Sequence, residues 1–162
     1  SSVNTNRMMR DPRNLVSTID AKSIGKMYMF FYDPKLKKQL PYYDTFPLIF
    51  VIGPAQGGFL GINLHYLPPV LRAKLMNAIY QTINNKRYDS STKLKISYDI
   101  LSSASRYRYF KPCVKHYLND HVQSKYLNIE PRNWDSALML PTERFKKATA
   151  SKVWEDSRGM IS

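Results

Sequence analysis

The sequence predicts an α+β fold, in which a small, partly open, SH3-like antiparallel β-sheet or barrel over about residues 26–66 is followed by a helical C-terminal half. Two observations predict it. Short aromatic and β-branched runs, separated by glycine and proline, fill the first part of the chain. After Pro68-Pro69 the apolar residues recur at every fourth position, which is typical of a helix.

Two strands that pair as a hairpin are the clearest part of the predicted sheet. Phe46–Ile52 is one strand, which Gly53-Pro54 is expected to end, and Phe59–Leu64 is the other. Gly57 and Gly58 are expected to supply positive φ angles at the bend. A phosphate-binding loop needs a helix directly after its glycines, and here a strand follows. This glycine pair therefore indicates a turn.

A further strand is predicted before the hairpin. Lys26–Tyr32, KMYMFFY, places aromatic and methionine side chains on both faces. The residues that follow, DPKLKK, are typical of a turn because Asp-Pro starts it and the lysines favour water.

The second half is expected to be mainly helical. The first predicted helix carries a stripe of apolar residues, Leu71, Leu75, Ile79 and Ile83. Arg72 and Lys74 lie outside this stripe. A second helix is expected from Thr92, a third from about Pro112 to His121, and a helical turn around Trp134. Lys125–Pro131 is expected to be a short strand or an extended link. A last helix is expected from Thr142 through ERFKKATASKVWEDSR.

One domain is expected from the length of 162 residues. We expect a flexible basic arm over residues 1–24 and a single domain over 25–162, β-rich over 25–67 and helical over 68–162. Because the chain begins with Ser1 rather than Met, it is expected to be either processed or truncated. No apolar run approaches the ~20 residues of a membrane span, so no membrane partner is expected.

The net charge indicates a polyanionic partner. Lysine and arginine number 25 against 12 aspartate and glutamate, a formal charge of +13. Such a charge makes a compact chain repel itself, a cost that binding to nucleic acid would offset. The alternative is a basic subunit that docks against acidic protein neighbours.

The strongest candidate for nucleic-acid binding is SRYRYFKPCVKHY, residues 105–117, in which cations alternate with aromatic residues and no acid occurs. The cations could bind phosphates while the rings stack on bases. The alternative is that the aromatic residues, Tyr107, Tyr109 and Phe110, belong to the core. The candidate residues of this segment are Arg106, Arg108, Lys111, Lys115, Tyr107 and Tyr109. Cations elsewhere that could extend the same surface are Lys93, Lys95, Lys35, Lys37, Lys38, Arg144, Lys146 and Lys147.

No catalytic residue, metal or cofactor is expected. The carboxylates are scattered, whereas metal-dependent phosphodiester cleavage needs them clustered. Cys113 and His116 would share a helix face, but a zinc site needs further ligands that the sequence does not supply. His65 is expected to be a packed or capping residue. As the only cysteine, Cys113 cannot form an internal disulfide.

Four long segments, in this order, carry a resemblance: GKMYMFFYDPKLKKQLPYYDTFPLIF, GGFLGINLHYLPPVLRAKLMNAIY, YFKPCVKHYL and WDSALMLPTERF. They resemble the DNA end protector family of T-even-like tailed phages, from about Gly25 onward. The resemblance implies a non-enzymatic virion protein that enters the head late. It would bind the ends of the packaged linear double-stranded DNA without sequence specificity and shield them from host exonucleases in the host cytoplasm.

The resemblance also bears on partners. It implies contacts with other virion proteins and leaves self-association open. It supplies no catalytic residues. The alternative function is a structural component of the phage neck, tail or baseplate that contacts only proteins.

Overall fold

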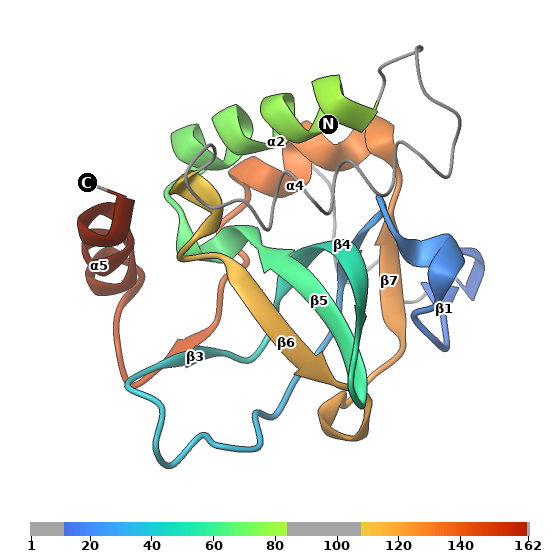
Figure 1. Cartoon of the computed structure of the whole chain (residues 1–162), viewed down its shortest axis with the longest axis horizontal. Helices are drawn as coiled ribbons and strands as arrows, with labels where there is room; N and C mark the ends of the chain where they lie inside the picture. The colour runs from blue at the N-terminus through green and yellow to red at the C-terminus, as the bar shows by residue number, and fades with distance from the viewer. Residues whose placement is uncertain (1–11, 84–107, 162) are drawn as a thin grey trace.

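A six-stranded antiparallel sheet forms the centre of the computed structural model, which describes residues 12–83 and 108–161 (Figure 1). Its strands lie in the order β1-β7-β2-β4-β5-β6. They are β1 (Leu15–Val16), β2 (Met27–Met29), β4 (Leu48–Ala55), β5 (Gly58–Asn63), β6 (Val114–Leu118) and β7 (Tyr126–Ile129). A separate two-stranded ribbon pairs β3 (Tyr43–Asp44) with β8 (Phe145–Lys146). The helices are α2 (Pro69–Ile83), α4 (Trp134–Met139) and α5 (Ala150–Ile161). The predicted α+β class is confirmed.

The sheet is curled, as a partly open barrel requires. Strands β5 and β7 are separated by β4 and β2, so in a flat sheet they would lie roughly 14 Å apart. The ring centroids of Phe59 on β5 and Tyr126 on β7 are nevertheless only 5.9 Å apart. Tyr32, beyond the end of β2, also forms a bridge with Val122, beyond the end of β6. These contacts bring the two edges of the sheet toward each other.

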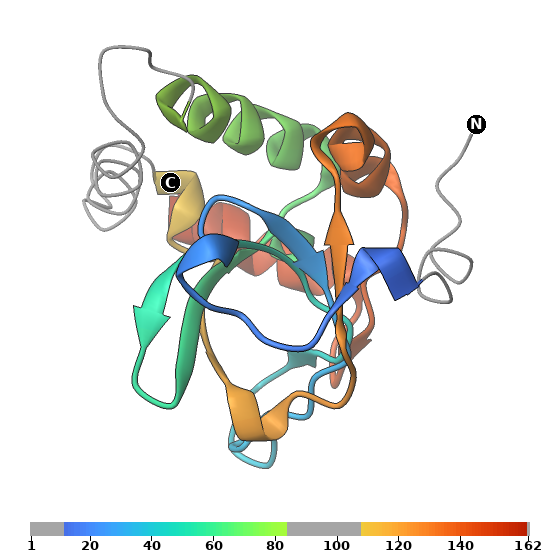
Figure 2. The same cartoon turned by 90° about the vertical axis from the view of Figure 1, so that its right-hand side faces the viewer.

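Both faces of the sheet are buried, each by a different set of side chains. Met27 and Met29 on β2 face the cluster that contains the helices, while Tyr28 and Phe30 point into an aromatic cluster on the other face. Helices α2 and α4 lie side by side against the first face (Figures 1 and 2). The prediction of apolar side chains on both faces of KMYMFFY is confirmed.

The β4–β5 hairpin is confirmed, with two corrections. Gly57 has a positive φ of 73°, as expected for the bend. Gly58 does not; a Cβ there would lie 1.8 Å from the Tyr117 carbonyl oxygen, so Gly58 is needed because β6 approaches closely. The strand also continues through Gly53-Pro54 to Ala55, because a register shift beside Gly53 accommodates the proline near the end of the ladder.

The predicted helix from Pro112 to His121 is wrong. Val114–Leu118 is strand β6, which pairs with β5 so that Tyr117 lies opposite Phe59. Pairing with the edge of β5 makes this segment a strand, although the spacing of its apolar residues is typical of a helix. The last helix begins only at Ala150, since residues 145–146 are in β8.

Three other expectations concern the remaining segments. Tyr126–Ile129 is a strand, and a helix begins at Trp134, as predicted. Within the segment predicted as an arm, Leu15–Val16 pair with β7, so this part belongs to the sheet. The helix expected from Thr92 lies outside the described residues.

Candidate nucleic-acid interface

A pocket of about 490 Å³ opens between strands β3 and β6 and the lysine loop, which we define as residues 33–41. Its lining combines aromatic rings with cations. Tyr42, Tyr43 and Tyr66 contribute to its walls, as do Lys35 from the lysine loop and Lys115 from β6. Tyr42 and Tyr43 are half-buried, so part of each ring remains accessible. Rings beside ammonium groups are a combination that can bind a base together with its phosphate.

Lys115 is the distinctive cation of this pocket. It is half-buried on β6, and its Nζ lies 4.0 Å from the centroid of the Tyr66 ring. Burial lowers the pKa of Lys115, because the charged form loses hydration. No carboxylate in the described part of the chain forms an ion pair with it. An anion that enters the pocket would therefore find a partly desolvated ammonium group that the ring alone stabilises.

Exposed cations lie on the lysine loop, which lines this pocket, and in or next to strand β8, which pairs with the pocket strand β3. The two segments are joined by Lys147, whose ammonium donates to the carbonyl oxygens of Lys37 and Leu40. In the loop Asp33 pairs with Lys37 at 2.9 Å, which cancels one charge. Over the residues that the structure describes, five exposed cations here have no carboxylate partner. They form what we call the basic surface: Lys35, Lys38, Arg144, Lys146 and Lys147.

Lys147 has the one positive φ among the described non-glycine residues, 71°. This left-handed backbone costs roughly 1–2 kcal/mol for a residue with a Cβ. The two hydrogen bonds from its ammonium, and its position 5.9 Å from the Tyr43 ring, offset that cost. Lys147 therefore fixes the lysine loop against the ribbon in addition to contributing charge.

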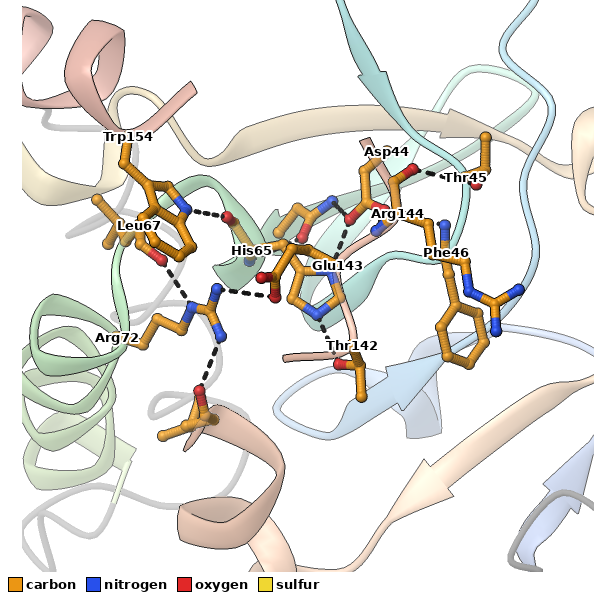
Figure 3. A network of polar contacts seen from close by, with 12 residues as sticks. Asp44, Thr45, Phe46, His65, Leu67, Arg72, Thr142, Glu143, Arg144 and Trp154 are labelled. Atoms are coloured by element: carbon orange, nitrogen blue, oxygen red, sulfur yellow. Dashed lines mark hydrogen bonds and ion pairs between the residues drawn. The ribbon is translucent and has the colours of Figure 1, made fainter. Parts of the chain in front are cut away.

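Asp44, on strand β3 of the ribbon, has a buried carboxylate that accepts four hydrogen bonds (Figure 3). Oδ1 of Asp44 accepts from the backbone N–H groups of Phe46 (3.0 Å) and Arg144 (3.1 Å). Oδ2 accepts from Asn63 Nδ2 (3.0 Å) and His65 Nδ1 (2.6 Å). Burial alone would raise the pKa of Asp44, but the His65 imidazole and the hydrogen bonds outweigh burial and lower it. This carboxylate connects the β3–β8 ribbon to β5.

His65 continues this network toward Thr142. Its Nε2 lies 2.9 Å from Thr142 Oγ1, which gives an aspartate–histidine–hydroxyl series like that of a hydrolase triad. The imidazole is completely buried, however, and Trp154 Nε1 donates to the His65 carbonyl oxygen at 2.8 Å. A substrate cannot reach the ring in this structure, so the series positions residues 142–144. The expectation that His65 is a packed residue is confirmed.

Arg72 is the second anchor of the same region, although the sequence placed it outside the apolar stripe. Its side chain is fully buried. Nε donates to the Leu67 carbonyl oxygen (2.6 Å), Nη1 to that of Leu138 (2.8 Å), and Nη2 to the Glu143 carboxylate (3.4 Å). Its guanidinium also lies 5.7 Å from the Trp154 ring. One side chain thus joins α2, α4 and the segment that leads into β8 (Figure 3).

The structure places only some of the predicted binding residues. Arg106, Tyr107, Lys93 and Lys95 lie outside the described residues. Arg108 begins a 3₁₀ turn, Arg108–Phe110.

The side chains that follow this turn point in different directions. Tyr109 packs against the core, Phe110 is buried in it, and Lys111 is exposed. Cys113 is buried while His116 is exposed, because three residues of extended chain place them on different sides. Among the described residues, no three His, Cys, Asp or Glu side chains are grouped as metal ligands.

The pocket tyrosines and the two buried anchors were missed from the sequence. Two signals could have found them. YYD in LPYYDTFP puts two rings next to an aspartate between apolar residues, which is unusual for solvent-exposed chain. Arg72, Leu75, Met76 and Ile79 follow the spacing i, i+3, i+4, i+7 of one helix face, and all four are buried.

These features define a small basic α+β protein whose exposed cations gather beside an aromatic pocket. The chain belongs to the family described as phage T4 terminal DNA protecting protein, whose family model matches residues 13–157. That description names protection of DNA and no enzymatic activity. The predicted family is therefore confirmed.

Comparisons with curated proteins and with solved structures give no match. Over residues 12–83 and 108–161, no helix is both long and apolar enough to span a membrane.

Proposed function

We propose that this protein binds the ends of linear double-stranded DNA without sequence specificity and shields them from host exonucleases. It would do so in the virion, beside other virion proteins, and in the host cytoplasm after the DNA enters. Membership of a terminal DNA protecting family is the observation that carries the proposal. The formal charge of +13 and the unpaired cations of the basic surface support it.

The charge arrangement suits contact with the DNA backbone. Duplex DNA carries one negative charge per about 1.7 Å of its length, and each phosphate that a protein neutralises releases condensed counterions. The cations of the basic surface come from two segments that Lys147 holds together. Phosphate contacts of this kind carry no sequence information, so binding would depend on salt and little on sequence.

Binding is tested with one DNA of fixed sequence in linear and in closed circular form, titrated over a series of salt concentrations. We expect the linear form to bind more tightly, with an affinity that falls by several powers of ten as salt rises. A blunt duplex should also lose nucleotides to an exonuclease more slowly when the protein is present. If neither form binds at low salt, the proposal fails and contacts with protein neighbours become the better explanation.

The contribution of the basic surface is tested with variants of equal charge. Lys35→Gln/Lys146→Gln should weaken binding and lower the slope of log affinity against log salt by about 0.9 for each phosphate that the protein no longer neutralises. Lys22→Gln/Lys125→Gln is the control, since both lysines are exposed, neither lines the pocket and neither belongs to the basic surface. Equal weakening by both pairs would mean that only net charge matters. Arg106→Ala and Arg108→Ala test the segment predicted from sequence.

A further inference from the structure

We propose that the pocket between β3, β6 and the lysine loop takes the terminal nucleotide of a DNA strand, with its base against Tyr42 and Tyr43 and its terminal phosphate on Lys115 and Lys35. This inference rests on the proposed function and assigns to it a specific site for the DNA end. It accounts for a feature that backbone binding leaves unexplained, because a duplex lying across the basic surface does not need a concave aromatic pocket.

The pocket has the size and the chemistry for one nucleotide. Its volume of about 490 Å³ falls in the range of about 300–1,000 Å³ that small-molecule sites occupy. The side chains of Tyr42 and Tyr43 are only partly buried, so they offer stacking surface to a base. Every base has an aromatic face, so this contact tolerates any sequence at the end.

The cations of the pocket would bind the terminal phosphate, while the tyrosines contact the base. Lys35 comes from the lysine loop and Lys115 from β6, and both line the pocket. Lys115 has no carboxylate partner in the described part of the chain, and its ammonium group lies over the Tyr66 ring. The one carboxylate that lines the pocket, Asp44, already accepts four hydrogen bonds and is buried beneath the surface. An anionic group can therefore approach Lys115 without meeting an exposed carboxylate there.

A terminal nucleotide fits this site better than an internal one. An internal base must break its pairing and both of its stacking contacts to enter a pocket. A terminal base is stacked on one side only, and it alone carries a terminal phosphate with its extra negative charge. The pocket would therefore discriminate an end from continuous duplex, which charge on a surface does not.

The test uses the full chain and short probes that do not depend on duplex binding. The probes are the dinucleotide (dT)₂ with a 5′ phosphate, with a 3′ phosphate, and with neither, and affinities are measured by NMR titration. We expect one phosphorylated form to bind at least about tenfold more tightly than the unphosphorylated form. The phosphorylated probe that binds more tightly identifies whether the 5′ or the 3′ end of the strand enters the pocket.

Two variants locate the effect. Lys115→Met keeps an apolar stem over Tyr66 and removes the charge, so it should reduce the preference for the phosphate to the part that Lys35 supplies. Lys125→Met, an exposed lysine with the same loss of charge outside the pocket, should keep it. Tyr43→Leu should weaken phosphorylated and unphosphorylated probes alike. If Lys115→Met does not fold, acetylation of the unmodified protein replaces it: the bound phosphorylated probe should protect Lys115 and not Lys125.

Three results would overturn the inference. One is equal binding of all three probes to the unmodified protein. Another is a phosphate preference that Lys115→Met leaves unchanged. The third is tighter binding of a short acidic peptide than of any dinucleotide, which would make a protein neighbour the occupant. The linear-against-circular assay reports separately on the proposed function. If linear DNA is preferred although the pocket ignores nucleotides, another part of the chain recognises the end and the proposed function stands without this site. If the pocket binds nucleotides but linear DNA is not preferred, the site stands and the proposed function fails.

Discussion

Replacing Arg72 with methionine is expected to lower the free energy of unfolding by about 3–5 kcal/mol, which is what breaking a buried ion pair typically costs. Methionine fills much of the same volume but donates no hydrogen bond. The carbonyl oxygens of Leu67 and Leu138 and the carboxylate of Glu143 then lose their charged partner. Each buried group left unsatisfied costs about 1–3 kcal/mol, so the two carbonyls alone account for roughly 2–6 kcal/mol.

One effect opposes this loss. Burial of the guanidinium is itself unfavourable, and it lowers the pKa of Arg72, so removing the charge recovers desolvation energy. For that reason Arg72→Met/Glu143→Gln, which removes both charges, should be more stable than Arg72→Met alone. Arg72→Lys keeps the charge but not the planar fork that reaches three acceptors, and it should fall between the parent and Arg72→Met.

Urea denaturation followed by fluorescence measures these changes, since typical domains have only about 5–15 kcal/mol of stability to lose. Lys74→Met on the same helix is the control, because Lys74 is exposed, and we expect it to change stability by no more than about 0.5 kcal/mol. A loss below about 1 kcal/mol for Arg72→Met would refute the reasoning. It would mean that the freed acceptors find water or other donors.

Three further predictions concern other buried groups. The pKa of Asp44 is lowered in the folded state, so the unfolded chain takes up the proton first as pH falls. The stabilisation that ionised Asp44 contributes should therefore be complete at neutral pH and be lost progressively below about pH 5. Asp44→Asn, less stable at pH 7, should lose less stability between pH 5 and 3 in the same denaturation assay. Gly58→Ala should cost at least about 2 kcal/mol because its Cβ would meet the Tyr117 carbonyl, whereas Gly159→Ala, with open space around it in α5, should raise the melting temperature. Burial raises the pKa of Cys113 to about 12, so a thiol reagent at pH 8 should label it only after denaturant is added; rapid labelling of the native protein would contradict its burial.

The sequence was informative where local pattern decides structure. The β4–β5 hairpin, helix α2 and the turn at Gly57 follow from alternation, spacing and the glycine itself. Strand β6 could not be predicted in this way, because its conformation depends on pairing with the edge of β5, which comes 52 to 60 residues earlier in the chain.

The site was less predictable than the fold. Charge indicated that the lysines of the loop, Arg144, Lys146 and Lys147 could extend one basic surface. The hydrogen bond from Lys147 to Leu40 places residue 147 beside the loop, and a shared DNA-binding surface stays a prediction. The pocket itself could not be foreseen, since it joins β3, β6 and the lysine loop. Arg72 was placed outside the stripe because it is charged, although its position in the heptad-like spacing was that of a buried residue.

Strand β7 lies between β1 and β2, although both of its neighbours come from the first thirty residues. While the ribosome is still making the chain, the position between β1 and β2 stays empty until residues 126–129 emerge. The Asp44 carboxylate likewise cannot accept its hydrogen bond from the N–H of Arg144 until that residue, 100 positions later, has been made. Contacts this distant in sequence slow folding, and the open edge of β2 can meanwhile pair with another nascent copy. A chain that stops before β7 is therefore expected to aggregate rather than to form a smaller stable protein.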